Sequence, residues 1–129
     1  MNKNTVFLIE DDANIVSIYT ISLEASKIDV VPITTGKEAM DKIKEIQDDK
    51  VEKPSLILLD LSLPDMNGKE IFKAIKANDK TKDIPVFITT NSDIKELPNT
   101  ENIHPDKFIL KSDITPTILA EIVKKQLGI

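Results

Sequence analysis

Residues 55–60 read Ser-Leu-Ile-Leu-Leu-Asp, an apolar run that ends in the carboxylate of Asp60. A second apolar run, residues 6–9, is followed by three consecutive acids at residues 10–12. Continuous apolar runs are typical of strands in a parallel sheet that is covered on both faces, and their carboxyl ends lie at one edge of the sheet. The sequence therefore predicts a cluster of carboxylates at that edge. Because neighbouring carboxylates repel one another, the cluster favours a bound cation, and hard oxygen ligands suit Mg²⁺.

Strand-like runs alternate with helix-like periodic segments along the chain, which is typical of a doubly wound α/β domain. We expect strands at residues 4–9, 28–33, 56–59, 86 to 89 or 90, and 108–110, and helices at residues 13–26, 36–46, 69–77 and 115–127. The first helix is indicated by the helical spacing of Ile15, Ile18 and Leu23. The last helix is expected to bury Ile118, Leu119, Ile122 and Val123.

The segment at residues 91–105 departs from this pattern. It contains two prolines and few apolar residues, so we expect at most a short helix over residues 93–97.

The composition narrows the class of protein. With 129 residues, we expect a single domain over residues 1–129 and no output domain in this chain. The absence of cysteine excludes disulfides and thiolate metal sites, which is compatible with a cytoplasmic location. A formal charge of −5 disfavours direct contact with nucleic acid. No apolar run has the length of a membrane span, so no membrane partner is expected.

Four segments together resemble the receiver domains of two-component response regulators, over essentially the whole chain. They are the acids at 10–12, the loop DLSLPDMNG at 60–68, the strand PVFITT at 85–90 and FILK at 108–111. An acidic pair alone is weak evidence, whereas this loop, with acids before it and Thr and Lys after it, is specific. The resemblance implies a CheY-like, doubly wound, five-stranded parallel sheet of order 2-1-3-4-5. About five flanking helices are expected, with the fourth short or irregular.

The resemblance implies roles for the acids. Asp60 is the expected phosphoacceptor, because an aspartate carboxylate can attack phosphorus and form an acyl phosphate. Mg²⁺ is expected to be held by Asp11, Asp60 and the backbone carbonyl of Ser62, with Glu10 assisting directly or through water. Asp12 is a plausible N-cap for the first helix instead of a ligand.

Three more residues complete the expected site. Lys111 is expected to pair with Asp60 before the reaction and with a phosphoryl oxygen after it. The hydroxyl of Thr90 is expected to bond a phosphoryl oxygen, although the adjacent Thr89 is an alternative whose side chain points to the opposite face of the strand. Phe108 occupies the aromatic switch position of the family, and core packing also accounts for it.

Two residues depart from the family pattern. Ser112 stands where the family usually has a cis-proline, so one device that fixes the loop geometry is missing. Asn91 stands where the family usually has a very small residue, and we expect it to slow access of a phosphodonor or of hydrolytic water.

The implied function is a phosphorylation switch. A histidine kinase or histidine phosphotransfer protein is expected to donate a phosphoryl group to Asp60 with Mg²⁺, and the change at an interaction surface is expected to reach a downstream protein target. Such a protein catalyses only its own phosphorylation and dephosphorylation.

Sequence features bear on three other functions. Ser112 and Asn91 keep open a non-cycling interaction module. A phosphatase of the haloacid dehalogenase type would need a second aspartate where Ser62 stands. A flavodoxin-like cofactor binder is disfavoured because no Gly-rich phosphate loop follows the first strand.

Overall fold

Five parallel strands form a single sheet in the computed structural model, which describes residues 4–91 and 103–129. Their spatial order is β2-β1-β3-β4-β5, as the family resemblance implies. The strands are β1 (Thr5–Ile9), β2 (Asp29–Ile33), β3 (Leu56–Asp60), β4 (Val86–Thr90) and β5 (Lys107–Leu110). The observed ends differ from the predicted ones by a single residue at most, so the predicted sheet is confirmed.

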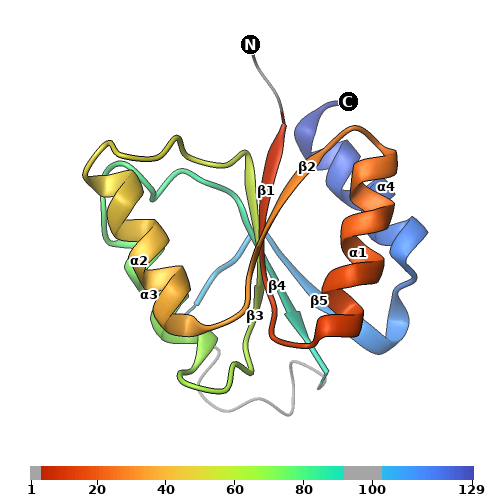
Figure 1. Ribbon diagram of the computed structural model, residues 1–129, viewed down its shortest axis with the longest axis horizontal. Helices are drawn as coiled ribbons and strands as arrows, with labels where there is room; N and C mark the ends of the chain where they lie inside the picture. The colour runs from red at the N-terminus through yellow and green to blue at the C-terminus, as the bar shows by residue number, and fades with distance from the viewer. Residues whose placement is uncertain (1–3, 92–102) are drawn as a thin grey trace.

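Helices cover both faces of this sheet (Figure 1). Helices α2 and α3 lie on one face, and α1 and α4 lie on the other. The helices of the described residues are α1 (Ala13–Ala25), α2 (Gly36–Gln47), α3 (Gly68–Lys76) and α4 (Pro116–Leu127), with a 3₁₀ turn, η2 (Lys111–Asp113). None of them is long and apolar enough to cross a membrane. The short helix expected over residues 93–97 lies outside the described residues.

A polar side chain at each helix start explains where the helices begin. Asp12, Thr35, Asn67 and Thr115 each accept a hydrogen bond from a backbone N–H of the first turn. Such caps satisfy amides that have no partner inside the helix. The cap role weighed for Asp12 is therefore what the structure shows.

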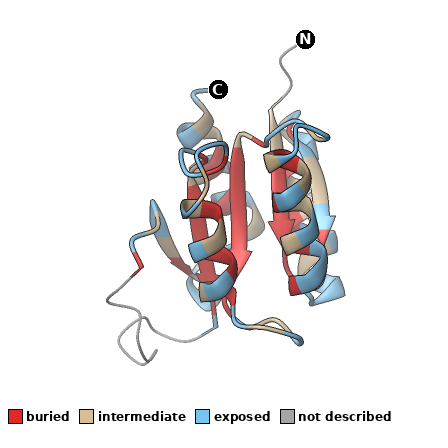
Figure 2. Ribbon diagram, turned by 90° about the vertical axis from the view of Figure 1, so that its left-hand side faces the viewer, coloured by how far each residue is buried: buried red, intermediate tan, exposed pale blue. Residues whose placement is uncertain are grey.

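The core has two halves, one on each face of the sheet. On the side of α2 and α3, Ile57, Leu59 and Ile88 belong to one buried cluster, whereas Leu58 and Phe87 belong to the cluster under α1 and α4. Alternate strand residues thus enter opposite halves, and every residue of β3 and β4 is buried (Figure 2). Burial on both faces explains why the central strands lack polar alternation.

The expected burial of Ile118 is wrong, and Ile18, which contributed to the helical spacing of the first helix, is exposed as well. Ile18 is 46% exposed and Ile118 is 47% exposed. In α1 the buried residues are Tyr19 and Leu23, which are four positions apart and share one side of the helix. Because successive helix residues point in directions about 100° apart, Ile118 turns away from the core when its neighbour Leu119 turns in.

Candidate functional site

Carboxylates from two neighbouring strands meet at the carboxyl edge of the sheet. Asp60 is the last residue of β3, and Glu10 follows directly after the adjacent strand β1. Oxygens of Glu10, Asp11 and Asp60 lie within 4.8 Å of one another. Glu10 and Asp60 are buried, at 1% and 3% exposure, whereas Asp11 is exposed to solvent. The predicted cluster of acids is therefore present.

Lys111 joins this cluster from the other side of β4. It follows directly after β5, and its ammonium Nζ lies 2.5 Å from Glu10 Oε1 and 3.1 Å from Asp60 Oδ2. Only 6% of the side chain is exposed. The sequence predicted the contact with Asp60; the contact with Glu10 is additional. Lys111 therefore serves as the counter-charge of both buried carboxylates.

Burial and the neighbouring charges shift the pKa values of Glu10 and Lys111. Burial raises the pKa of Glu10 above its ordinary value, against the hydrogen bonds from Lys111 and the Asp12 N–H, and the charge of Asp60 raises it further. For Lys111, burial lowers the pKa, but the bond to Glu10 and the charges of Asp60 and Glu10 outweigh it, so the pKa is raised overall. The ammonium is therefore firmly protonated between two acids.

The site has a net negative charge that suits a divalent cation. Three carboxylates and one ammonium leave a formal charge of −2 when all four are ionised. The donors are hard oxygens, and the exposed Asp11 leaves the cluster open to water. Mg²⁺ binds through few carboxylates and keeps several waters, so Glu10, Asp11 and Asp60 fit it.

The loop after Asp60 folds back on the strand end. The Ser62 N–H donates to Asp60 Oδ1 at 3.1 Å, and Ser62 forms an antiparallel bridge with Asn67. Gly68 lies so close that an added Cβ would be 2.5 Å from the Asp60 carbonyl oxygen and 2.7 Å from Leu61 Cα. Glycine is therefore required where α3 begins, and this close approach holds the loop beside Asp60.

The two threonines of β4 face opposite sides. Thr89 is the register partner of Asp60, and Thr90 lies one residue further toward the carboxyl edge. Both are buried. Thr90 shares a face with Ile88, whose register partner on β5 is Phe108. The half-buried Phe108 packs against the core on the α2 and α3 side, so Thr90 and Phe108 lie on the same face of the sheet. Their switch roles stay predictions.

Both departures from the family pattern lie at the rim of the site. Asn91 is exposed immediately after β4, and Ser112 is exposed in the turn after Lys111. The peptide bond between Lys111 and Ser112 is trans.

Tyr19 is a neighbour of the site that the sequence interpretation missed. It is 4% exposed on α1, and burial raises its pKa, with the charges of Glu10 and Asp60 adding to the effect and that of Lys111 opposing it. The phenol therefore lies within the field of the acidic cluster. Tyr19 lies four residues after Ile15 and four residues before Leu23, and this helical spacing could have indicated that Tyr19 is buried.

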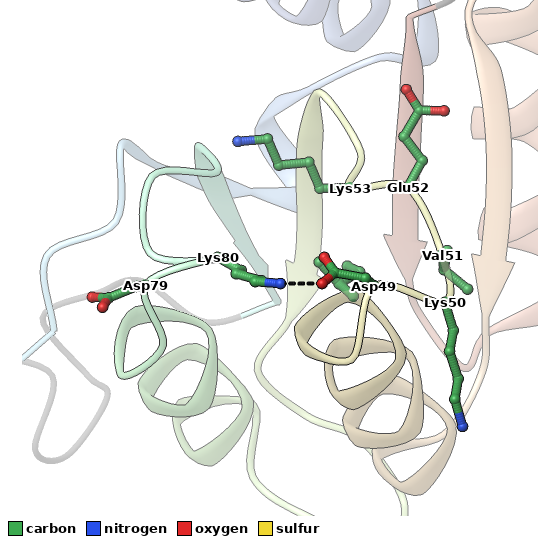
Figure 3. Close-up of a pocket in the computed structure, with 8 residues that line it drawn as sticks. Asp49, Lys50, Val51, Glu52, Lys53, Asp79 and Lys80 are labelled. Atoms are coloured by element: carbon green, nitrogen blue, oxygen red, sulfur yellow. Dashed lines mark hydrogen bonds and ion pairs between the residues drawn. The ribbon is translucent and has the colours of Figure 1, made fainter.

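A separate surface pocket lies at the opposite end of the sheet (Figure 3). Its polar lining alternates three acids with three lysines, and Lys80 forms an ion pair with Asp49. The pocket therefore has no excess of either charge. It is lined by Ile46, Asp49, Lys50, Val51, Glu52, Lys53, Asp79 and Lys80, none of which belongs to the acidic cluster.

Comparison with known proteins gives one family. The model of the response regulator receiver domain matches residues 6–124. The regulatory protein LuxO of Vibrio cholerae is 32% identical over 105 residues, which cover 81% of this chain but only 21% of LuxO. The polar-differentiation response regulator DivK of Brucella anthropi is 29% identical over 127 residues, which cover 96% of this chain and 96% of DivK.

One similar solved structure is a metal-bound form. The Mn²⁺-bound form of the response regulator Rcp1 superposes with a TM-score of 0.74 at 26% identity, covering 97% of this chain and 90% of that one. The metal in that structure is bound by Rcp1. The chain described here spans about a fifth of the length of LuxO.

Proposed function

Because this chain belongs to the response regulator receiver family, we propose that Asp60 accepts a phosphoryl group and switches the protein between two states. Receiver domains are the signalling switches of two-component systems. The observation that carries the proposal is the buried Asp60 carboxylate, held 3.1 Å from Lys111 Nζ beside two further acids.

Two hydrogen bonds that fix the orientation of the Asp60 carboxylate support its role as the nucleophile. Lys111 holds Oδ2, and the Ser62 N–H holds Oδ1. In the reaction a carboxylate oxygen forms the new bond to phosphorus while the bond to the donor's leaving group breaks. Lys111 then transfers its hydrogen bond from the carboxylate to a phosphoryl oxygen, where a charge-assisted bond is strong.

Glu10, Asp11, Asp60 and the Ser62 carbonyl would hold Mg²⁺ in this site. When bound, the ion supplies positive charge that lets an anion approach the phosphoryl group. The acids alone would repel a phosphoryl donor, so we expect the reaction to depend on the ion.

The switch joins the site to an interaction surface. Thr90 turns its hydroxyl toward the phosphoryl group, and Phe108, on the same face of the sheet, changes position with it. A histidine kinase or histidine phosphotransfer protein supplies the phosphoryl group, and a downstream protein binds the altered surface. In this proposal the chain is one receiver domain over residues 1–129, acts in the cytoplasm and catalyses only reactions of its own aspartyl group.

The test is the mass of the intact protein after incubation with acetyl phosphate, with Mg²⁺ or with a chelator. We expect a gain of one phosphoryl mass that requires Mg²⁺. A folded protein that gains no mass from acetyl phosphate or from a phosphorylated histidine phosphotransfer protein would contradict the proposal and favour a non-cycling interaction module.

A further inference from the structure

The N-terminus of α2 is capped by a residue from the phosphoacceptor loop. Gly36 N–H donates to Asp65 Oδ1 at 2.7 Å, and Lys37 N–H donates to Asp65 Oδ2 at 2.9 Å. The next amide, of Glu38, donates to the helix's own cap, Thr35 Oγ1, at 3.1 Å. Two of the first three amides of α2 are therefore satisfied by a side chain that lies almost thirty positions away.

The Asp65 carboxylate is well suited to this position. Hydrogen bonds from the Gly36 and Lys37 amides lower its pKa, so it stays ionised at neutral pH. A negative charge at a helix N-terminus also interacts favourably with the helix dipole. Because each oxygen binds a different amide, the carboxylate is fixed in direction as well as in position.

The contact between the loop and α2 is close. A Cβ at Gly36 would lie 2.1 Å from Met66 Cγ and 3.0 Å from Asp65 Oδ1. The absence of a side chain at Gly36 is what lets Asp65 and Met66 lie directly on the start of the helix.

The same loop is fixed at its base beside Asp60. Gly68 N–H donates to the Leu61 carbonyl at 2.9 Å, and Ser62 N–H donates to Asp60 Oδ1 at 3.1 Å. The Ser62 carbonyl lies near the base of the loop, and Asp65 lies at its tip. The tip is therefore tied to α2, and the base is tied to the phosphoacceptor.

We propose that Asp65 is a positioning residue, which clamps the loop to α2 and so fixes the Ser62 backbone for the metal and the phosphoryl group. This inference rests on the proposed function. The helix itself does not need the clamp, because Thr35 still caps it and Glu38 Oε1 accepts a bond from the Thr34 N–H at 3.2 Å. Loss of Asp65 should therefore act on the loop and leave α2 helical.

The test compares Asp65→Ala and Asp65→Asn with Asp41→Asn, a control that neutralises an exposed carboxylate of α2, which is paired to Lys37 at 3.0 Å. Calorimetry gives the Mg²⁺ Kd of each folded protein, and acetyl phosphate titration separates the maximal rate from the half-saturating donor concentration. For Asp65→Ala we expect about a three- to tenfold weaker Mg²⁺ affinity and a similar fall in maximal rate. This effect is smaller than that of removing a residue that directly hydrogen-bonds a metal ligand. Asp65→Asn keeps one accepting oxygen and should lie between Asp65→Ala and the wild type.

Amide hydrogen exchange at Gly36 and Lys37 reports the clamp itself. Faster exchange there in Asp65→Ala, with unchanged Mg²⁺ affinity and unchanged rate, would overturn the proposal, as would an equal effect of Asp41→Asn. If the wild type takes up no phosphoryl group, the proposed function fails, and the Mg²⁺ affinities still decide the role of Asp65. If Asp65→Ala does not fold, Asp65→Asn carries the comparison.

Discussion

Replacing Asp60 by asparagine is expected to abolish phosphoryl uptake. An amide is neutral and is not a competent nucleophile toward phosphorus, and asparagine keeps the size and most of the hydrogen bonds of the side chain. The substitution also removes one anionic oxygen ligand, so the Mg²⁺ Kd should rise at least about tenfold, or about 1.4 kcal/mol. Intact mass and calorimetry measure the two effects.

Asp41→Asn is the matched control for charge. It neutralises an exposed carboxylate on α2 whose side chain is 60% exposed. We expect its phosphorylation and its Mg²⁺ affinity to equal those of the wild type. Phosphorylation of Asp60→Asn at the wild-type level would rule out Asp60 as the acceptor.

Replacing Lys111 by methionine is expected to change phosphorylation and metal affinity in opposite senses. The variant loses the hydrogen-bond donor to the phosphoryl oxygens, and loss of one such donor in a preorganised site typically lowers the rate by about 10²–10³-fold. It also removes the cation 3.1 Å from Asp60 and 2.5 Å from Glu10, which competes with a metal ion for the same oxygens. The Mg²⁺ affinity should therefore rise while the phosphorylation rate falls.

The stability of Lys111→Met provides a second readout. Without metal, two buried carboxylates lose their counter-charge, and we expect a loss of about 1–3 kcal/mol in the free energy of unfolding. The pKa of Glu10 is already raised by burial. A raised folded-state pKa means that stability is lost as the pH rises through it, so the defect should grow from acidic to neutral pH.

Added Mg²⁺ should restore much of this stability. Thermal unfolding with and without the ion measures the difference, and Lys82→Met, which replaces an exposed lysine paired to Asp79, is the control. A variant that phosphorylates at the wild-type rate, or that binds Mg²⁺ more weakly than the wild type, would contradict the role assigned to Lys111.

Local sequence patterns sufficed for the strands and for acids at their carboxyl ends, which include Asp60 and Glu10. The apolar runs define buried strands, and parallel topology brings their carboxyl ends to one edge, while the strand order that places β1 beside β3 was implied by the family resemblance. The side of each helix that faces the core could not be predicted in the same way, because Ile118, which was expected to be buried, is exposed, and so is Ile18. Each lies next to another apolar residue, and packing between elements decides which of two neighbours faces the core.

Contacts across long sequence separations were the other limit. The turn residues 64–68 predict a loop, but not that Asp65 reaches back to the amides of α2. Nor does the sequence show that Lys111 binds Glu10 as well as Asp60. Both contacts depend on the packing of distant elements, which no local pattern records.

Chemical trapping tests most directly whether Asp60 carries the phosphoryl group. Borohydride reduces an aspartyl phosphate to homoserine, so the phosphorylated protein is reduced, digested and sequenced by mass spectrometry. We predict homoserine at position 60, dependent on Mg²⁺ and on acetyl phosphate. Homoserine at Asp11 or Asp12, or a phosphoryl group on another side chain with Asp60 unmodified, would contradict the account.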